Sequence, residues 1–122
     1  MPSRYEPCGL NQMYSLRYGT VPVVRATGGL ADTVTDEDAH PGAGTGYTFG
    51  PYEATAMLGA VGRARRAFEE APRWEALMLR GMRQDFSWKQ SARQYVDVYE
   101  HAAELGQKRI RAATGKGAKS MR

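Results

Sequence analysis

Cysteine and histidine are almost absent from this 122-residue chain, which holds only Cys8, His40 and His101. A single cysteine excludes a disulfide within the chain, and the three residues show no metal-ligand spacing. No apolar run is long enough to cross a membrane, and residues 1–4 precede no apolar signal region. We therefore expect a cytoplasmic protein with no membrane contact, no metal and no cofactor.

Acidic residues are missing after Glu104, where the chain is instead rich in lysine and arginine. The net charge of the whole chain is +4, so the basic end accounts for its sign. Such a segment could contact nucleic acid, but no aromatic residue is interleaved there for base stacking. We expect residues 106–122 to be a loose, solvated tail, and we expect no nucleic-acid partner.

A turn followed by an amphipathic helix is the most informative local pattern. Pro7 and Gly9 suit a tight entry into a helix, and Gly19 is a natural stop. Apolar residues recur between them at helical spacing: Leu10, Met13, Tyr14 and Tyr18. The pattern predicts a helix over residues 9–18 whose N-terminus favours a phosphate, beside a Glu6 carboxylate suited to sugar hydroxyls. An ordinary loop-to-helix junction is the alternative.

A short β-branched run over residues 21–25 predicts a buried parallel strand, and helix followed by strand is half of a Rossmann-like repeat. Thr27, Gly28 and Gly29 follow at its C-terminal end, where ligands gather in open α/β sheets. The paired glycines allow either the close approach of a ligand or a simple tight turn. Residues 30–34 read as a helical turn and residues 45–49 as an extended segment at the sheet edge. The acids between them, Asp36, Glu37 and Asp38, are expected to be solvated.

Helical periodicity dominates from about Tyr52 onward. Three stripes predict three helices, with Pro72 between the first and second. The first stripe comprises Ala54, Met57, Leu58, Val61, Ala64 and Phe68. The second comprises Trp74, Leu77, Met78 and Met82, and the third comprises Trp88, Ala92, Tyr95, Val96 and Tyr99. Stripes of this kind are typical of a core, so we expect them to be buried and assign them no chemistry.

Residues 2–34, PSRYEPCGLNQMYSLRYGTVPVVRATGGLADTV, closely resemble the donor-site segment of bacterial glycogen synthases and plant starch synthases. The resemblance continues through residues 45–49 and 85–88 and fades after Leu105. These families are retaining glycosyltransferases that use ADP-glucose. The resemblance implies an α/β fold: an incomplete Rossmann-like C-terminal half-domain of a GT-B glycosyltransferase, mostly helical with a short parallel strand. Residues 1–50 would be its nucleotide-sugar donor segment, residues 51–105 its helical remainder and residues 106–122 a basic tail.

The resemblance also implies the roles of individual residues. Glu6 would be catalytic, through a hydrogen bond to a glucose hydroxyl. The backbone of Cys8, Gly9 and Leu10 would line the glucose, and the amides near Leu10 and Asn11 would face a phosphate. Thr27, Gly28 and Gly29 would lie on the ligand side.

Two positions depart from the pattern of related transferases. Tyr14 stands where many of them carry a second glutamate, often assigned to the nucleotide ribose, which fits enzymes that use ADP-glucose. Asn11 stands where close members often have threonine, and both side chains can hydrogen-bond a phosphate or cap the turn.

The implied partners are ADP-glucose, an α-1,4-glucan acceptor and an N-terminal lobe that this chain does not include. Without that lobe we expect the chain to be inactive. A small basic binding protein without catalytic activity, with glucan, nucleic acid or protein as its partner, is the alternative.

Overall fold

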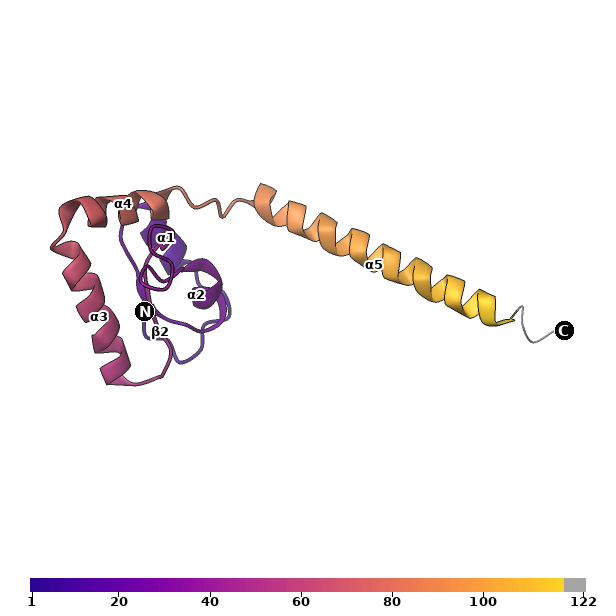
Figure 1. Cartoon of the computed structure of the whole chain (residues 1–122), viewed down its shortest axis with the longest axis horizontal. Coiled ribbons are helices and arrows are strands. Elements are labelled where there is room, and N and C mark those ends of the chain that lie inside the picture. Colours follow the sequence, from indigo (N-terminus) through magenta and orange to yellow (C-terminus); the bar gives the residue numbers. More distant parts are fainter. Residues whose placement is uncertain (118–122) are drawn as a thin grey trace. The chain divides into compact units, whose positions relative to one another are not determined.

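The computed structural model describes the backbone of residues 1–117 and the side chains of residues 1–110. Two compact units make up the chain, Met1–Gln84 and the residues from Asp85 onward. Seven elements follow one another along residues 1–117, and Figure 1 traces them from the N-terminus to the long last helix. None of the helices described is both long enough and apolar enough to cross a membrane.

A two-stranded parallel sheet lies at the centre of the first unit. Strand β1 (Val23–Arg25) pairs with β2 (Tyr47–Phe49), with Val23 opposite Tyr47. On its other edge β1 pairs with the chain start, because the Met1 amino group donates to the Val23 carbonyl oxygen at 2.6 Å and the Arg25 N–H donates to the Met1 carbonyl oxygen at 3.0 Å. The short parallel strand predicted over residues 21–25 is thereby confirmed, as is the extended segment after it.

Four helices surround this sheet: α1 (Asn11–Arg17), α2 (Gly28–Thr33), α3 (Ala54–Phe68) and α4 (Ala71–Met82). Helix α3 packs on both strands and on α4, while α1 packs on α4 and α2. The expected helix over residues 9–18 begins two residues late. Gly9 has a φ of +69°, far from the α-helical value of about −63°, so the chain turns there before α1 starts.

Two apolar clusters occupy the opposite faces of the sheet, because successive strand residues point to opposite sides. One face carries Tyr47 with Ala64, Ala67 and Leu77 of α3 and α4. The other carries Val24 with Leu30 and Val34 from α2 and the residue after it. The result is the α/β arrangement that the sequence predicts, in which helices cover both faces of the strands.

The buried face of α3 differs from the predicted stripe. Ala60, Ala64 and Ala67 are buried, whereas Leu58 and Phe68 are about three-fifths exposed. Small alanine side chains let the helix axis approach the sheet closely, so the alanine face packs inward and the larger side chains remain outside. In the second stripe Leu77 is fully buried, as expected, whereas Met82 is exposed, contrary to expectation.

Helix α5 (Trp88–Gly117) corrects two expectations. The predicted loose tail begins at residue 106, but the helix continues through Gly117; the rest of that segment, residues 118–122, lies outside the described residues. Alanine, lysine, arginine and glutamine are good helix formers, and they outnumber the glycines there. The aromatic stripe expected to be buried is exposed, with Trp88 at 84% and Tyr99 at 67%, because the described part of this unit offers no second element to cover it.

Candidate functional site

The loop formed by residues 6–10 rests directly on the glycine pair at the start of α2. The Gly29 N–H donates a hydrogen bond of 3.0 Å to the Glu6 carbonyl oxygen. A Cβ atom on Gly28 would lie 2.0 Å from that same oxygen, and one on Gly29 would lie 2.0 Å from the Cys8 carbonyl oxygen. No side chain fits at either position while loop 6–10 keeps its place. The two segments that the sequence singles out as site residues therefore meet in space.

This contact explains why residues 28 and 29 are glycines, a question that the sequence left open. Neither alternative, ligand approach or simple turn, anticipates that the chain's own backbone fills the space above Gly28 and Gly29. Gly28 also has a φ of +45°, a conformation that favours glycine. Gly28 and Gly29 thus pack against one side of loop 6–10, and the other side of the loop faces solvent.

The side of loop 6–10 that faces solvent presents the predicted site residues. Cys8, Leu10, Asn11 and Tyr14 are exposed, and Glu6 is half-buried. Among the described residues, none donates a hydrogen bond or forms an ion pair with the Glu6 carboxylate. A half-buried carboxylate without a protein partner is free to accept hydrogen bonds from ligand hydroxyl groups.

Gln12 was missed by the sequence analysis, although it holds loop 6–10 from the other side. Its side chain is completely buried, and its Nε2 donates to the carbonyl oxygens of Cys8 at 2.9 Å and Gly9 at 3.0 Å. A polar residue four positions before Leu16, on the same buried face of α1, was the available signal. Gly9 makes room for this amide, since a Cβ there would lie 2.7 Å from Gln12 Oε1 and 3.2 Å from Glu6 Cγ.

Arg25, at the C-terminal end of β1, fastens the segment that leads into loop 6–10. Its Nη1 donates to the Arg4 carbonyl oxygen at 2.5 Å, and its Nε donates to the Gly50 carbonyl oxygen at 3.1 Å. Its guanidinium lies 5.5 Å from the centre of the Tyr52 ring. The ends of both strands are thereby tied to the chain just before Glu6.

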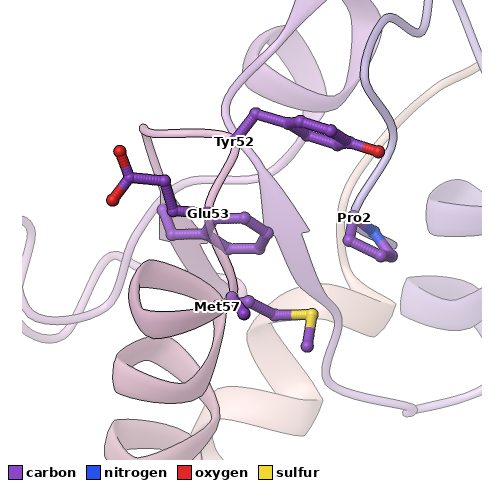
Figure 2. A pocket seen from close by; sticks show the side chains of 6 residues that line it. Pro2, Tyr52, Glu53 and Met57 are labelled. Carbon is purple, nitrogen blue, oxygen red and sulfur yellow. The ribbon is translucent and has the colours of Figure 1, made fainter.

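A small pocket opens beside this anchor, and Figure 2 shows Pro2, Tyr52, Glu53 and Met57 around it. Phe49 and Ala54 complete its lining. None of the predicted site residues lines this pocket, so it is separate from the surface of loop 6–10. The sequence analysis did not predict it, because its lining comes from the chain start, β2 and the start of α3.

The acids of residues 36–38 are paired rather than solvated, contrary to expectation. Arg63 contacts Asp36 at 3.0 Å and Asp38 at 2.9 Å, Arg73 contacts Asp38 at 3.1 Å, and Arg80 pairs with Glu37. These pairs fasten the loop after α2 to α3 and α4. Within the described residues no cluster of histidine, cysteine or acidic side chains could hold a metal ion.

The pKa of Asp36 records this pairing. Burial would raise it, but hydrogen bonds from Arg63, Thr48 and Ala39, together with the Arg63 charge, outweigh burial and lower the pKa to about 2. Asp36 therefore carries a full negative charge at neutral pH, and its role is to hold its loop through ion pairs. The surface of loop 6–10 is the better candidate for chemistry.

Comparisons with known proteins show what the chain is homologous to. No protein-family model matches the chain. The glycogen synthase of Koribacter versatilis is 54% identical over 105 residues, which are 86% of this chain and 22% of that enzyme. The glycogen synthase of Anaeromyxobacter sp. strain Fw109-5 is 59% identical over 103 residues, 84% of this chain and 22% of that enzyme.

A solved structure gives the fold independently. The catalytic domain of starch synthase IV from Arabidopsis thaliana, bound to ADP and acarbose, superposes with a TM-score of 0.73 at 37% identity, covering 84% of this chain and 22% of that one. The chain therefore has the fold of the matching part of a starch synthase catalytic domain, which is of the GT-B type. It is homologous to the glycogen synthases and corresponds to a C-terminal part of them, spanning about a fifth of their length.

Proposed function

We propose that this chain forms the donor-sugar part of a glycogen or starch synthase, which transfers glucose from ADP-glucose to the non-reducing end of an α-1,4-glucan. The observation that carries the proposal is the position of loop 6–10: it packs on Gly28 and Gly29 and holds the half-buried Glu6 carboxylate, which has no hydrogen-bond or ion-pair partner among the described residues. The homology to glycogen synthases over more than four-fifths of the chain supports the same assignment.

The transfer requires that the leaving diphosphate, which gains charge in the transition state, meet preorganised hydrogen-bond donors. It also requires that the sugar be held at the reacting angle and that water be excluded. In our proposal Glu6 accepts a hydrogen bond from a glucose hydroxyl, and the backbone at Cys8, Gly9 and Leu10 lines the sugar. The amides of Leu10 and Asn11 face a phosphate, and Tyr14 and Thr27 border the donor.

The acceptor surface and further phosphate contacts belong, in this proposal, to the part of the enzyme that the chain does not span. The N-terminal lobe would close over loop 6–10, and the reaction would take place in the cytoplasm. The 122-residue chain alone should therefore transfer no glucose, because loop 6–10 by itself supplies only a fraction of the electrostatic stabilisation.

The test uses a chimeric enzyme, in which the 103 matched residues of this chain replace their counterparts in the Anaeromyxobacter glycogen synthase. We expect glucose incorporation into glycogen from labelled ADP-glucose. Glu6→Gln should lower kcat roughly 10- to 100-fold with a smaller effect on KM, because a hydrogen bond to a charged group at the reacting centre is worth about 1.5–3 kcal/mol. A folded chimera without activity, or a Glu6→Gln effect on KM alone, would contradict the proposal.

A further inference from the structure

The buried amide of Gln12 is placed at a cost that packing alone does not explain. Its Oε1 is buried and has no hydrogen-bond partner among the described residues. An unsatisfied buried acceptor destabilises the fold, whereas an apolar side chain of similar size would fill the same space without that penalty. The amide therefore serves something other than the stability of α1.

Both hydrogens of the Gln12 amide are used on loop 6–10. A glutamine NH2 group has two donors, and here one reaches the Cys8 carbonyl oxygen and the other the Gly9 carbonyl oxygen. Two consecutive carbonyl groups are thus turned toward Gln12. Because each belongs to a rigid, planar peptide group, Gln12 fixes the orientation of two adjacent peptide planes.

The N–H groups on the opposite edges of these two peptide planes are oriented as well. All peptide bonds in the described chain are trans, so the N–H of each peptide points away from its own carbonyl oxygen. The N–H groups of Gly9 and Leu10 therefore point away from Gln12, and neither donates a hydrogen bond to any described residue. Two adjacent free N–H groups form a concavity that binds anionic oxygen atoms.

We propose that Gln12 is a positioning residue for glucosyl transfer: its buried amide holds loop 6–10 so that the Leu10 N–H group meets the leaving diphosphate of the sugar nucleotide, while the adjacent Gly9 N–H group lines the sugar. The inference rests on the proposed function and deepens it. Gln12 touches no substrate, and it acts through the peptide groups that it orients. Because charge develops on the leaving phosphate only as the bond breaks, loosening these donors should affect kcat more than donor binding.

Two substitutions in the chimeric enzyme test the proposal. Gln12→Met keeps the volume and removes both donors, and kcat should fall about 100-fold, as expected for a misplacement of about 1 Å, with the KM for ADP-glucose within about threefold of the unsubstituted chimera. Gln84→Met is the matched control, because Gln84 is exposed and its Nε2 lies 3.5 Å from the Arg80 carbonyl oxygen. The control should leave both parameters unchanged.

Gln12→Glu adds a readout that a purely structural residue would not give. A neutral glutamic acid can donate one hydrogen bond to these carbonyl oxygens, whereas its carboxylate can donate none. The kcat of Gln12→Glu, divided by that of the unsubstituted chimera at the same pH, should therefore rise as the pH is lowered. This profile also decides the matter if Gln12→Met does not fold.

The outcomes separate the two proposals. An inactive but folded chimera overturns the proposed function and this inference with it. An active chimera in which Gln12→Met keeps its kcat, or in which only the melting temperature falls, overturns the role of Gln12 alone. A Gln12→Glu ratio that does not change with pH does the same.

Discussion

A methyl group at Gly29 should disable the site without entering it. In Gly29→Ala the new Cβ would lie 2.0 Å from the Cys8 carbonyl oxygen and 2.6 Å from the Cys8 carbonyl carbon. Real Cβ atoms essentially never approach closer than 3.0 Å, so loop 6–10 and the start of α2 must move apart by at least 1.0 Å, the difference between 3.0 and 2.0 Å. The obstacle is the backbone of Cys8, which cannot rotate away as a flexible side chain could.

The stability of the fold and kcat should respond differently to this displacement. Overpacking of a single methyl group costs about 1–3 kcal/mol, which a complete enzyme can tolerate. A shift of about 1 Å in groups that contact the reacting sugar can cost about 100-fold in rate. We therefore expect Gly29→Ala in the chimeric enzyme to remain folded and to lose roughly two orders of magnitude in kcat.

Steady-state kinetics with ADP-glucose and glycogen, together with a thermal melt, form the assay. Gly59→Ala is the control, because Gly59 is exposed on α3 and nothing lies within 4 Å of a Cβ there. That substitution should stabilise the helix by up to about 1 kcal/mol and leave the kinetics unchanged. A Gly29→Ala enzyme with a kcat within twofold of the unsubstituted chimera would refute the reasoning.

Three further predictions concern the acid pairs and the donor. Arg63→Ala should lower the free energy of unfolding of the 122-residue chain by about 2–3 kcal/mol, measured by urea titration. The control Arg65→Ala, which breaks an exposed ion pair, should change it by less than about 0.5 kcal/mol. Because the pKa of Asp36 is lowered from 3.8 to about 2, its contribution of about 2 kcal/mol to the free energy of unfolding should be present above pH 3.8 and lost as the pH falls toward 2. Thermal melts at several pH values measure this loss. An equal loss of stability in Arg63→Ala over the same pH range would contradict the assigned cause. The chimera should prefer ADP-glucose to UDP-glucose, since Tyr14 replaces a second acid, and a higher kcat/KM for UDP-glucose would exclude this.

Local signals explain which parts of the fold the sequence could predict. The β-branched run around Val24 and the helical period before Gly19 each act over a few residues, and the structure has a strand and a helix there. The resemblance of residues 2–34 to glycogen synthases adds the fold of the larger enzyme.

Long-range contacts explain what the sequence could not predict. Asp36 and Arg63 are 27 residues apart, and Glu37 and Arg80 are 43 apart, so no local pattern distinguishes these paired acids from solvated ones. A stripe such as that of α5 shows that a helix is amphipathic but does not say what covers it. In the candidate site the prediction named the exposed residues, and it missed the buried Gln12 because a polar residue in a helix is usually solvated.

The contacts that shape loop 6–10 come from different elements of the first unit and act on the backbone. The glycine pair of α2 contacts the carbonyl groups of Glu6 and Cys8. Gln12 of α1 donates to the carbonyl groups of Cys8 and Gly9, and Arg25 of β1 holds the segment before Glu6. A loop restrained in this way is ordered before any ligand arrives, so binding need not supply the entropy of ordering it. Substitutions of the side chains that contact the ligand and substitutions of the residues that hold loop 6–10 should therefore affect the same catalytic step. For this reason Gly29→Ala and Gln12→Met should resemble Glu6→Gln in lowering kcat more than they alter KM, although neither Gly29 nor Gln12 is proposed to touch the sugar.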